Sequence, residues 1–103
     1  MRKGLITMNR DDVLYKAVET VQERGESYGD ASQSFMRIAE MWGAFLDQKI
    51  TPADVAIMMI MLKIARLESA PNHSDSWVDI CGYAALAGEI TSESDNSNNQ
   101  HPL

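Results

Sequence analysis

The chain has 103 residues, with 15 acidic and 9 basic side chains and a formal net charge of −6. This length predicts one domain, and 45% hydrophobic with 23% charged residues is typical of a globular protein. The acidic balance argues against direct binding to nucleic acid, which requires a basic surface. The single cysteine, Cys81, excludes an internal disulfide and favours a reducing, cytoplasmic setting. No apolar run is long enough to cross a membrane, and we expect no secretory signal because the basic first residues are not followed by an apolar stretch.

The first predicted helix begins near Asn9, because asparagine caps helices and the acidic pair Asp11 and Asp12 suits the positive end of the helix dipole. Apolar residues then recur at helical spacing, at Leu14, Val18 and Val21. Gly25 is the predicted end of this helix, and residues 25–30 are rich in turn formers.

The second predicted helix begins at Ser32 or Ser34 and carries an aromatic-rich stripe typical of a core face. The stripe consists of Phe35, Ile38, Ala39, Trp42, Phe45 and Leu46. Gly43 lies inside this helix at a cost of roughly 1 kcal/mol relative to alanine, which we interpret as the close approach of another helix.

The third predicted helix has the clearest start in the chain. Thr51 is the expected cap, Pro52 stands at the first helical position, and Asp54 follows the cap by three residues. Residues 55–67 are apolar nearly all round the helix. We therefore expect this helix to be the central one, covered by its neighbours or by a second subunit.

The fourth predicted helix begins at Ser74 or Asp75 and ends near Ala87, where Gly88 would cap it. Residues 91–103 are almost entirely polar, which predicts a disordered acidic tail after a single helical domain over residues 8–90. No segment alternates with period two for long enough to indicate a strand. The expected fold is an all-α, compact bundle of about four helices.

Two pairs of charged residues are the main candidates for chemistry. Lys63 and Arg66 share a face of the third helix, and Asp75 and Asp79 stand one turn apart on the fourth. A helical hairpin would bring the two pairs together. They would then form a ladder of structural salt bridges, or the cations would bind phosphate while the carboxylates hold Mg²⁺.

Tyr28 and Tyr83 are the candidate contacts for a nucleotide base. Tyr28 stands between Ser27 and Gly29, where an aromatic ring is easily presented to a ligand, although packing against other helices is an equal alternative. Tyr83 continues the face of the fourth helix that carries the two aspartates. His73 is interpreted as a surface residue of the preceding loop.

Several ordered segments resemble a family of small, uncharacterised phage and prophage proteins, over about residues 10–88. They are Arg24-Gly25-Glu26-Ser27-Tyr28-Gly29-Asp30, Phe35-x-x-Ile38-Ala39-x-x-Trp42, Ile50-Thr51-Pro52-x-Asp54, Lys63-Ile64-Ala65-Arg66 and His73-x-Asp75-Ser76-x-Val78-Asp79. This resemblance implies a phage protein acting in the host cytoplasm and specifies no activity.

Three motifs resemble more distant families, namely the Tyr28-Gly29 loop, Lys63-x-x-Arg66 and Asp75-x-x-x-Asp79-x-x-x-Tyr83. These families are the nucleotide-modification-associated proteins of phages and the MazG-like and dimeric dUTPase-like, all-α nucleoside triphosphate pyrophosphohydrolases. That resemblance implies a Mg²⁺ site on a helical bundle that a dimer or tetramer completes. The sequence departs from the enzyme pattern at two places. Glu23-x-x-Glu26 straddles Gly25, and the late acids, Asp75 and Asp79, are four residues apart instead of three.

Three functional hypotheses follow. The first is a nucleotide-binding phage protein, with Mg²⁺-dependent pyrophosphohydrolysis as its catalytic form. The second is a noncatalytic inhibitor or adaptor that binds a host protein through exposed acids, namely Asp11, Asp12, Glu19 and Glu23. The third is a sponge that binds a nucleotide without hydrolysis.

The third helix is too apolar for one layer of helices to cover. We therefore also expect a homodimer or higher oligomer with this helix at or beside the two-fold seam; a monomer with a central third helix is the alternative.

Overall fold

The described part of the chain contains four α-helices and no strand, which confirms the all-α prediction. The computed structural model describes the backbone of residues 7–28 and 30–98, and the side chains of residues 7–26 and 30–92. The helices are α1 (Arg10–Tyr28), α2 (Ala31–Leu46), α3 (Pro52–Ser69) and α4 (Ser74–Asn98). None of these helices is long and apolar enough to cross a membrane.

Two helices begin with the predicted caps. In α1 the Asp12 amide donates to the Asn9 side chain at 2.8 Å, and the Asn9 amide donates to the Asp12 carboxylate at 3.1 Å. In α3 the Thr51 hydroxyl and the Asp54 carboxylate each accept from the other residue's amide, both at 3.0 Å. These reciprocal bonds satisfy amides that a helix start leaves without partners.

Helix α2 begins earlier than predicted. Its cap is Asp30, whose carboxylate accepts from the Ser32 amide at 3.0 Å, and neither Ser32 nor Ser34 starts the helix. Both are ordinary N-cap residues, but Asp30 is an equally good cap and lies directly after the α1–α2 connection.

Two glycines that were predicted to end helices lie inside them. Helix α1 continues past Gly25, and α4 continues past Gly88 to Asn98. A helical glycine costs only about 1 kcal/mol, which favourable neighbours offset. Residues 91–98 of the predicted tail therefore extend α4, and residues 99–103 lie outside the described residues.

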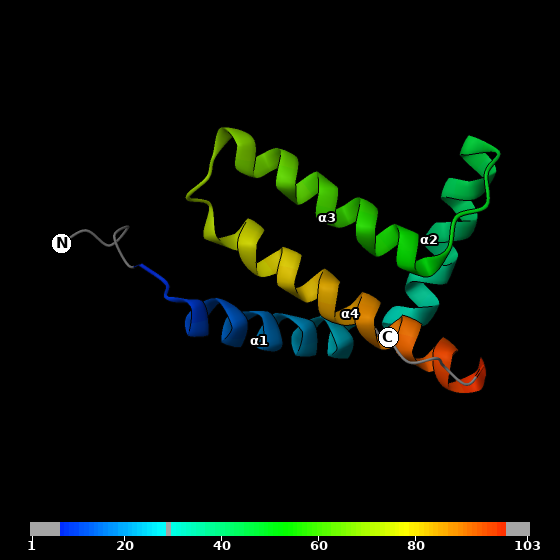
Figure 1. Ribbon diagram of the computed structural model, residues 1–103, viewed down its shortest axis with the longest axis horizontal. Helices are drawn as coiled ribbons and strands as arrows, with labels where there is room; N and C mark the ends of the chain where they lie inside the picture. Colours follow the sequence, from blue (N-terminus) through cyan, green and yellow to red (C-terminus); the bar gives the residue numbers. More distant parts are fainter. Residues whose placement is uncertain (1–6, 29, 99–103) are drawn as a thin grey trace.

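The helices form a layer in which α4 lies between α3 and α1 (Figure 1). Helix α3 runs antiparallel to α4 on one side, and α1 packs along the other side. Helix α2 crosses the end of this layer and packs on α3. The prediction that α3 is the central helix was wrong, because α4 lies in the middle of the layer and α3 lies at its edge.

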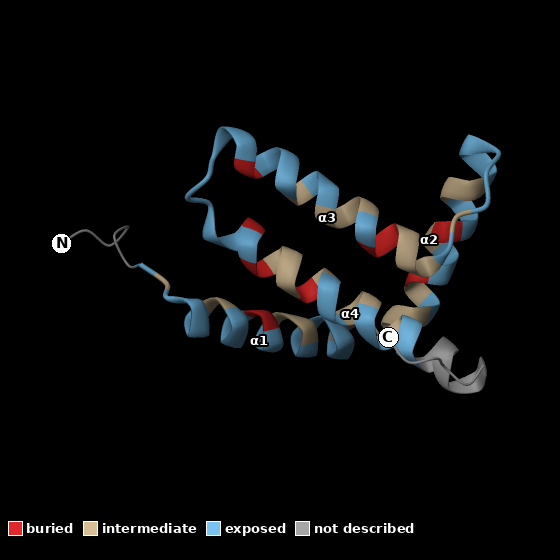
Figure 2. Cartoon of the chain, viewed as in Figure 1, coloured by how far each residue is buried: buried red, intermediate tan, exposed pale blue. Residues whose placement is uncertain are grey.

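The core lies where α2 crosses α3. Its buried members are Phe35 and Ala39 of α2 and Val55 and Ala56 of α3, with partly buried residues of α4 packed against them. Away from this crossing, buried residues appear only as short bands on each helix (Figure 2).

The close approach predicted at Gly43 exists, but its partner is not another helix. A Cβ added there would lie 2.8 Å from the Gln48 carbonyl oxygen, in the connection that follows α2. That connection turns back sharply at Asp47, a non-glycine residue with φ 55° in the left-handed region. Gly43 is therefore required by the turn that leads from α2 into α3.

Candidate functional site

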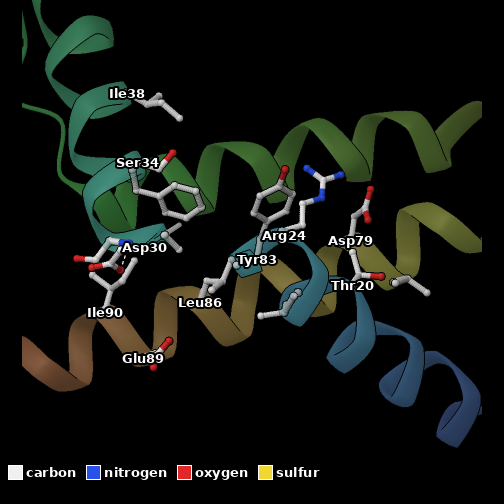
Figure 3. A pocket seen from close by; sticks show the side chains of 17 residues that line it. Thr20, Arg24, Asp30, Ser34, Ile38, Asp79, Tyr83, Leu86, Glu89 and Ile90 are labelled. Carbon is white, nitrogen blue, oxygen red and sulfur yellow. Dashed lines mark hydrogen bonds between the residues drawn. The ribbon is translucent and has the colours of Figure 1, made fainter. Parts of the chain in front are cut away.

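A pocket of about 460 Å³ lies between α1, α2 and α4 (Figure 3). Its polar and charged lining residues are Thr20 and Arg24 of α1, Asp30, Ser32 and Ser34 at the start of α2, and Asp79, Tyr83 and Glu89 of α4. Its apolar walls include Val21, Phe35, Ile38, Val78, Leu86 and Ile90. A mostly apolar cavity of this size with a few polar groups is typical of a small-molecule site.

Helical spacing explains why these side chains meet. On α4, Asp79, Tyr83 and Leu86 recur at intervals of four and three residues, so they share one face of the helix. On α1, Thr20 and Arg24 are one turn apart and share a face in the same way. Gly82 allows α1 close to α4, since a Cβ there would lie 3.4 Å from the Val21 side chain.

Two aromatic rings form one wall of the pocket. The centroids of Phe35 and Tyr83 are 6.3 Å apart and the rings are inclined by 32°, which is within the range of favourable aromatic pairs. Phe35 is buried in the core and Tyr83 is half-buried. The core therefore holds the Tyr83 ring in place at the pocket surface.

The charged groups concentrate beside Tyr83. Figure 3 shows the side chains of Arg24, Tyr83 and Asp79 directed into the same part of the pocket. The Asp79 carboxylate also forms an ion pair with the Lys63 ammonium of α3, with 3.0 Å between Nζ and Oδ2. The side chains of Lys63 and Asp79 are only 16% and 26% exposed, so water screens this pair less than a surface pair.

The predicted charge ladder is only half formed. Lys63 pairs with Asp79, whereas among the described residues no ion pair joins Arg66 to Asp75, and both of these residues are exposed. Arg66 instead lines a separate hollow of about 200 Å³ with Ser69, Ala70 and His73. The pocket therefore receives Asp79 and Tyr83 of the predicted site residues, with Lys63 adjoining through its ion pair.

His73 has a structural role beside that smaller hollow. Its Nδ1 lies 2.8 Å from the hydroxyl oxygen of Ser76, which is only 1% exposed. A buried hydroxyl without a partner would be costly, so this hydrogen bond helps to fix the first turn of α4. His73 is exposed, as predicted for a loop histidine.

The other predicted contacts are placed as follows. Tyr28 ends α1, and its side chain lies outside the described residues. In the described part of the chain, no group of three or more histidine, cysteine, aspartate or glutamate residues is arranged to hold a metal ion. The predicted Mg²⁺ ligands, Asp75 and Asp79, are therefore two carboxylates without a third ligand of this kind among the described residues, and Asp79 already pairs with Lys63.

Arg24 and the start of α2 belong to the site although they were not among the predicted site residues. Arg24 follows Thr20 by four residues and the buried Ala17 by seven, so helical spacing alone places it on the inner side of α1. The contribution of α2 depends on a tertiary crossing that no local pattern reveals.

Comparison with known proteins gives a family and relatives. The family described as "Domain of unknown function (DUF6378)" matches residues 12–91. The "Gene 55 protein" of Mycobacterium phage L5 is 46% identical over 76 residues, which cover 72% of this chain and 49% of the relative. The "Gene 55 protein" of Mycobacterium phage D29 is 38% identical over 84 residues, covering 81% of this chain and 56% of the relative.

These matches support the resemblance to small phage proteins. The chain spans about half the length of the curated relatives it matches. No solved structure matches the chain. The more distant resemblance to MazG-like enzymes has no counterpart among these relatives and stays a prediction.

Proposed function

The chain belongs to the family described as a domain of unknown function, DUF6378, and from its pocket we propose that it binds a nucleotide between α1, α2 and α4. The observation that supports this most directly is the position of Tyr83 and Arg24 in one pocket. An aromatic face stacks on a base, and a guanidinium binds phosphate oxygens through paired hydrogen bonds.

The size and walls of the pocket suit such a ligand. About 460 Å³ falls within the range of roughly 300–1,000 Å³ that small-molecule and cofactor sites occupy. Tyr83 and the apolar side chains beside it offer a surface for the base. The hydroxyls of Thr20, Ser32 and Ser34 lie on the lining and can hydrogen-bond to a base edge or a sugar.

The phosphates would lie towards Arg24 and the Lys63–Asp79 pair. The lining also carries the acids Asp30, Asp79 and Glu89, which repel phosphate unless a cation accompanies it. Mg²⁺ usually binds through one or two carboxylates together with the phosphates of its nucleotide. Asp79 can contribute carboxylate oxygens to such an ion, and Arg24 and the adjoining Lys63 can contact the phosphates. Arg66 and Asp75, which the sequence also suggested for these roles, lie outside the pocket.

Nucleotide binding is tested by calorimetric titration with a panel of ribo- and deoxyribonucleotides, with and without Mg²⁺. We expect saturable binding, and we expect Arg24→Gln to weaken it by about tenfold or more, because a charge-assisted contact is lost. The matched control is Arg37→Gln, the same change at an exposed position of α2 outside the pocket. Absence of binding by the whole panel, or equal losses in the two variants, would contradict the proposal.

Hydrolysis is the finer form of this proposal, and a separate measurement decides it. Release of pyrophosphate from a bound nucleoside triphosphate in the presence of Mg²⁺ would identify a pyrophosphohydrolase, and Asp79→Asn should then abolish turnover. Recovery of the intact nucleotide after saturable binding would identify a nucleotide sponge. Both results are compatible with the pocket, and only the first makes the protein an enzyme.

A second candidate function is a noncatalytic adaptor that binds a host protein, and the surface of α1 favours it. Asp11, Asp12, Glu19 and Glu23 are all exposed, as that hypothesis requires. An acidic surface can occupy a basic channel of a partner that otherwise binds nucleic acid. Affinity capture from host lysate should recover one stoichiometric partner, which Glu19→Lys and Glu23→Lys release; capture that survives the charge reversal counts against this candidate.

A further inference from the structure

The side of the α1–α4–α3 layer that lies opposite the pocket exposes large apolar side chains on all three helices. We call this the open face and define it by Leu14, Val18, Ile57, Met61, Ile64 and Trp77, each between 48% and 56% exposed. Monomeric proteins rarely expose a contiguous apolar patch of this kind unless it binds a partner.

Helical geometry places these residues on one side of the layer. On α4, Trp77 is nine residues, or two and a half turns, before Leu86, so the two side chains are on opposite faces, and Leu86 lines the pocket. On α3, Met61 is turned well away from Lys63, which pairs with Asp79 on the pocket side. On α1, Val18 is two residues before Thr20, so its side chain is on nearly the opposite face of the helix from this pocket residue.

Small, uncharged residues of α4 lie at the centre of the open face. Cys81, Ala84 and Gly88 follow Trp77 at intervals of four, three and four residues, so they continue its face along α4. Small residues allow another helix to approach closely, and charged residues are depleted at the centres of protein interfaces. The chain thus presents a large aromatic ring at one end of α4 and a shallow strip at the other.

We propose that a second copy of this chain covers the open face and forms a two-fold symmetric dimer. In such a dimer the two α4 helices run antiparallel, so the Trp77 ring of each copy packs over the strip at Ala84 and Gly88 of the other. A two-fold interface requires a self-complementary surface, and this ring-and-strip arrangement is one. Stacking two copies also supplies the second packed layer that a helical domain requires and that α2 supplies only at one end.

The area available fits a dimer. The six large side chains, each about half exposed, amount to on the order of 600 Å² of apolar surface per chain. Two copies would bury about 1,200 Å², which is the lower limit for stable and specific interfaces. Helix α3 then lies beside the two-fold axis, and α4 lies on it.

The dimer is tested by light scattering and sedimentation of the full chain over a range of concentrations. We expect the wild type to have twice the 11.5 kDa chain mass. Ala84→Glu should have the mass of one chain, because it places a charge at the centre of the interface at a position where glutamate favours helix. The matched control is Ala44→Glu, the same change at an exposed position of α2, and it should remain a dimer.

Two further measurements make the test independent of folding defects. Circular dichroism should show unchanged helix content in Ala84→Glu, and Ile64→Glu on α3 should dissociate the dimer as well. Cys81 should react with a maleimide several times faster in both variants than in the wild type, because it leaves the interface. A wild type with the mass of one chain throughout, or a dimer that Ala44→Glu breaks and Ala84→Glu does not, would overturn the proposal.

Discussion

At the scale of single residues, the Lys63–Asp79 ion pair is the contact where structure and proposed function meet. The sequence predicted that these charges face each other across a helical hairpin, and left open whether they pair or bind a ligand. The pair forms, with both side chains largely covered. Arg66 and Asp75 do not pair. They lie about one helical turn nearer to the α3–α4 connection than Lys63 and Asp79, and both are exposed there. The spacing of the charges along each helix does not show this difference in exposure.

We predict that Lys63→Met lowers the free energy of unfolding by about 1–3 kcal/mol, because it leaves the Asp79 carboxylate largely buried without its partner. Adding Asp79→Asn should recover part of this loss, since the uncompensated charge is then gone. Urea denaturation of the wild type, the two single variants and the double variant measures the coupling. Strictly additive losses would mean that the ion pair contributes no stability.

At the scale of helices, the sequence predicted the starts better than the ends. Asn9 and Thr51 were recognised because a cap is a local arrangement of a side chain and the amide three residues later. The predictions for Gly25 and Gly88 were wrong because a glycine ends a helix only where the backbone adopts a left-handed conformation, and at both positions the backbone stays helical. Of the site, α4's contribution could be predicted and α2's could not.

The two kinds of helical glycine can be separated experimentally. We predict that Gly43→Ala destabilises the protein by about 1–3 kcal/mol, because the new Cβ would meet the Gln48 carbonyl oxygen at 2.8 Å and a backbone atom cannot move aside easily. Gly25→Ala should instead stabilise it by about 0.5–1 kcal/mol, since nothing lies within 4 Å of its Cβ position and alanine favours helix. Thermal unfolding of both variants gives the sign, and the same sign for both would refute the argument.

At the scale of the whole molecule, the apolar residues of α3 predicted a central helix covered by its neighbours or by a second subunit, and the central position was wrong. Periodicity shows how much apolar surface a helix carries and does not show which neighbours cover it. In the structure α4 is central, and Ile57, Met61 and Ile64 of α3 remain about half exposed. The dimer proposed above would cover these residues, and the period of the apolar residues alone does not identify their neighbour.

An uncharged interface between two acidic chains has a characteristic response to salt. Each copy carries a net charge of −6, so dimerisation brings together two like-charged molecules. We predict that raising NaCl from about 20 mM to about 300 mM strengthens the dimer, because salt screens the repulsion and leaves the apolar contact in place. Sedimentation equilibrium at the two salt concentrations measures this, and weaker association at high salt would indicate an interface held by ion pairs.

The short connection between α3 and α4, residues 70–73, has a consequence for how the chain acquires its structure. The most extensively packed pair of helices is also joined by a short link, so its formation costs little loop-closure entropy. We expect the α3–α4 hairpin to form in the transition state of folding and α1 to dock afterwards. In denaturant-jump kinetics, Leu67→Ala at a buried position of α3 should then mainly slow folding, whereas Val13→Ala in α1 should mainly speed unfolding. During synthesis, α1 would leave the ribosome before α3 and α4 and would pack only after the hairpin has formed.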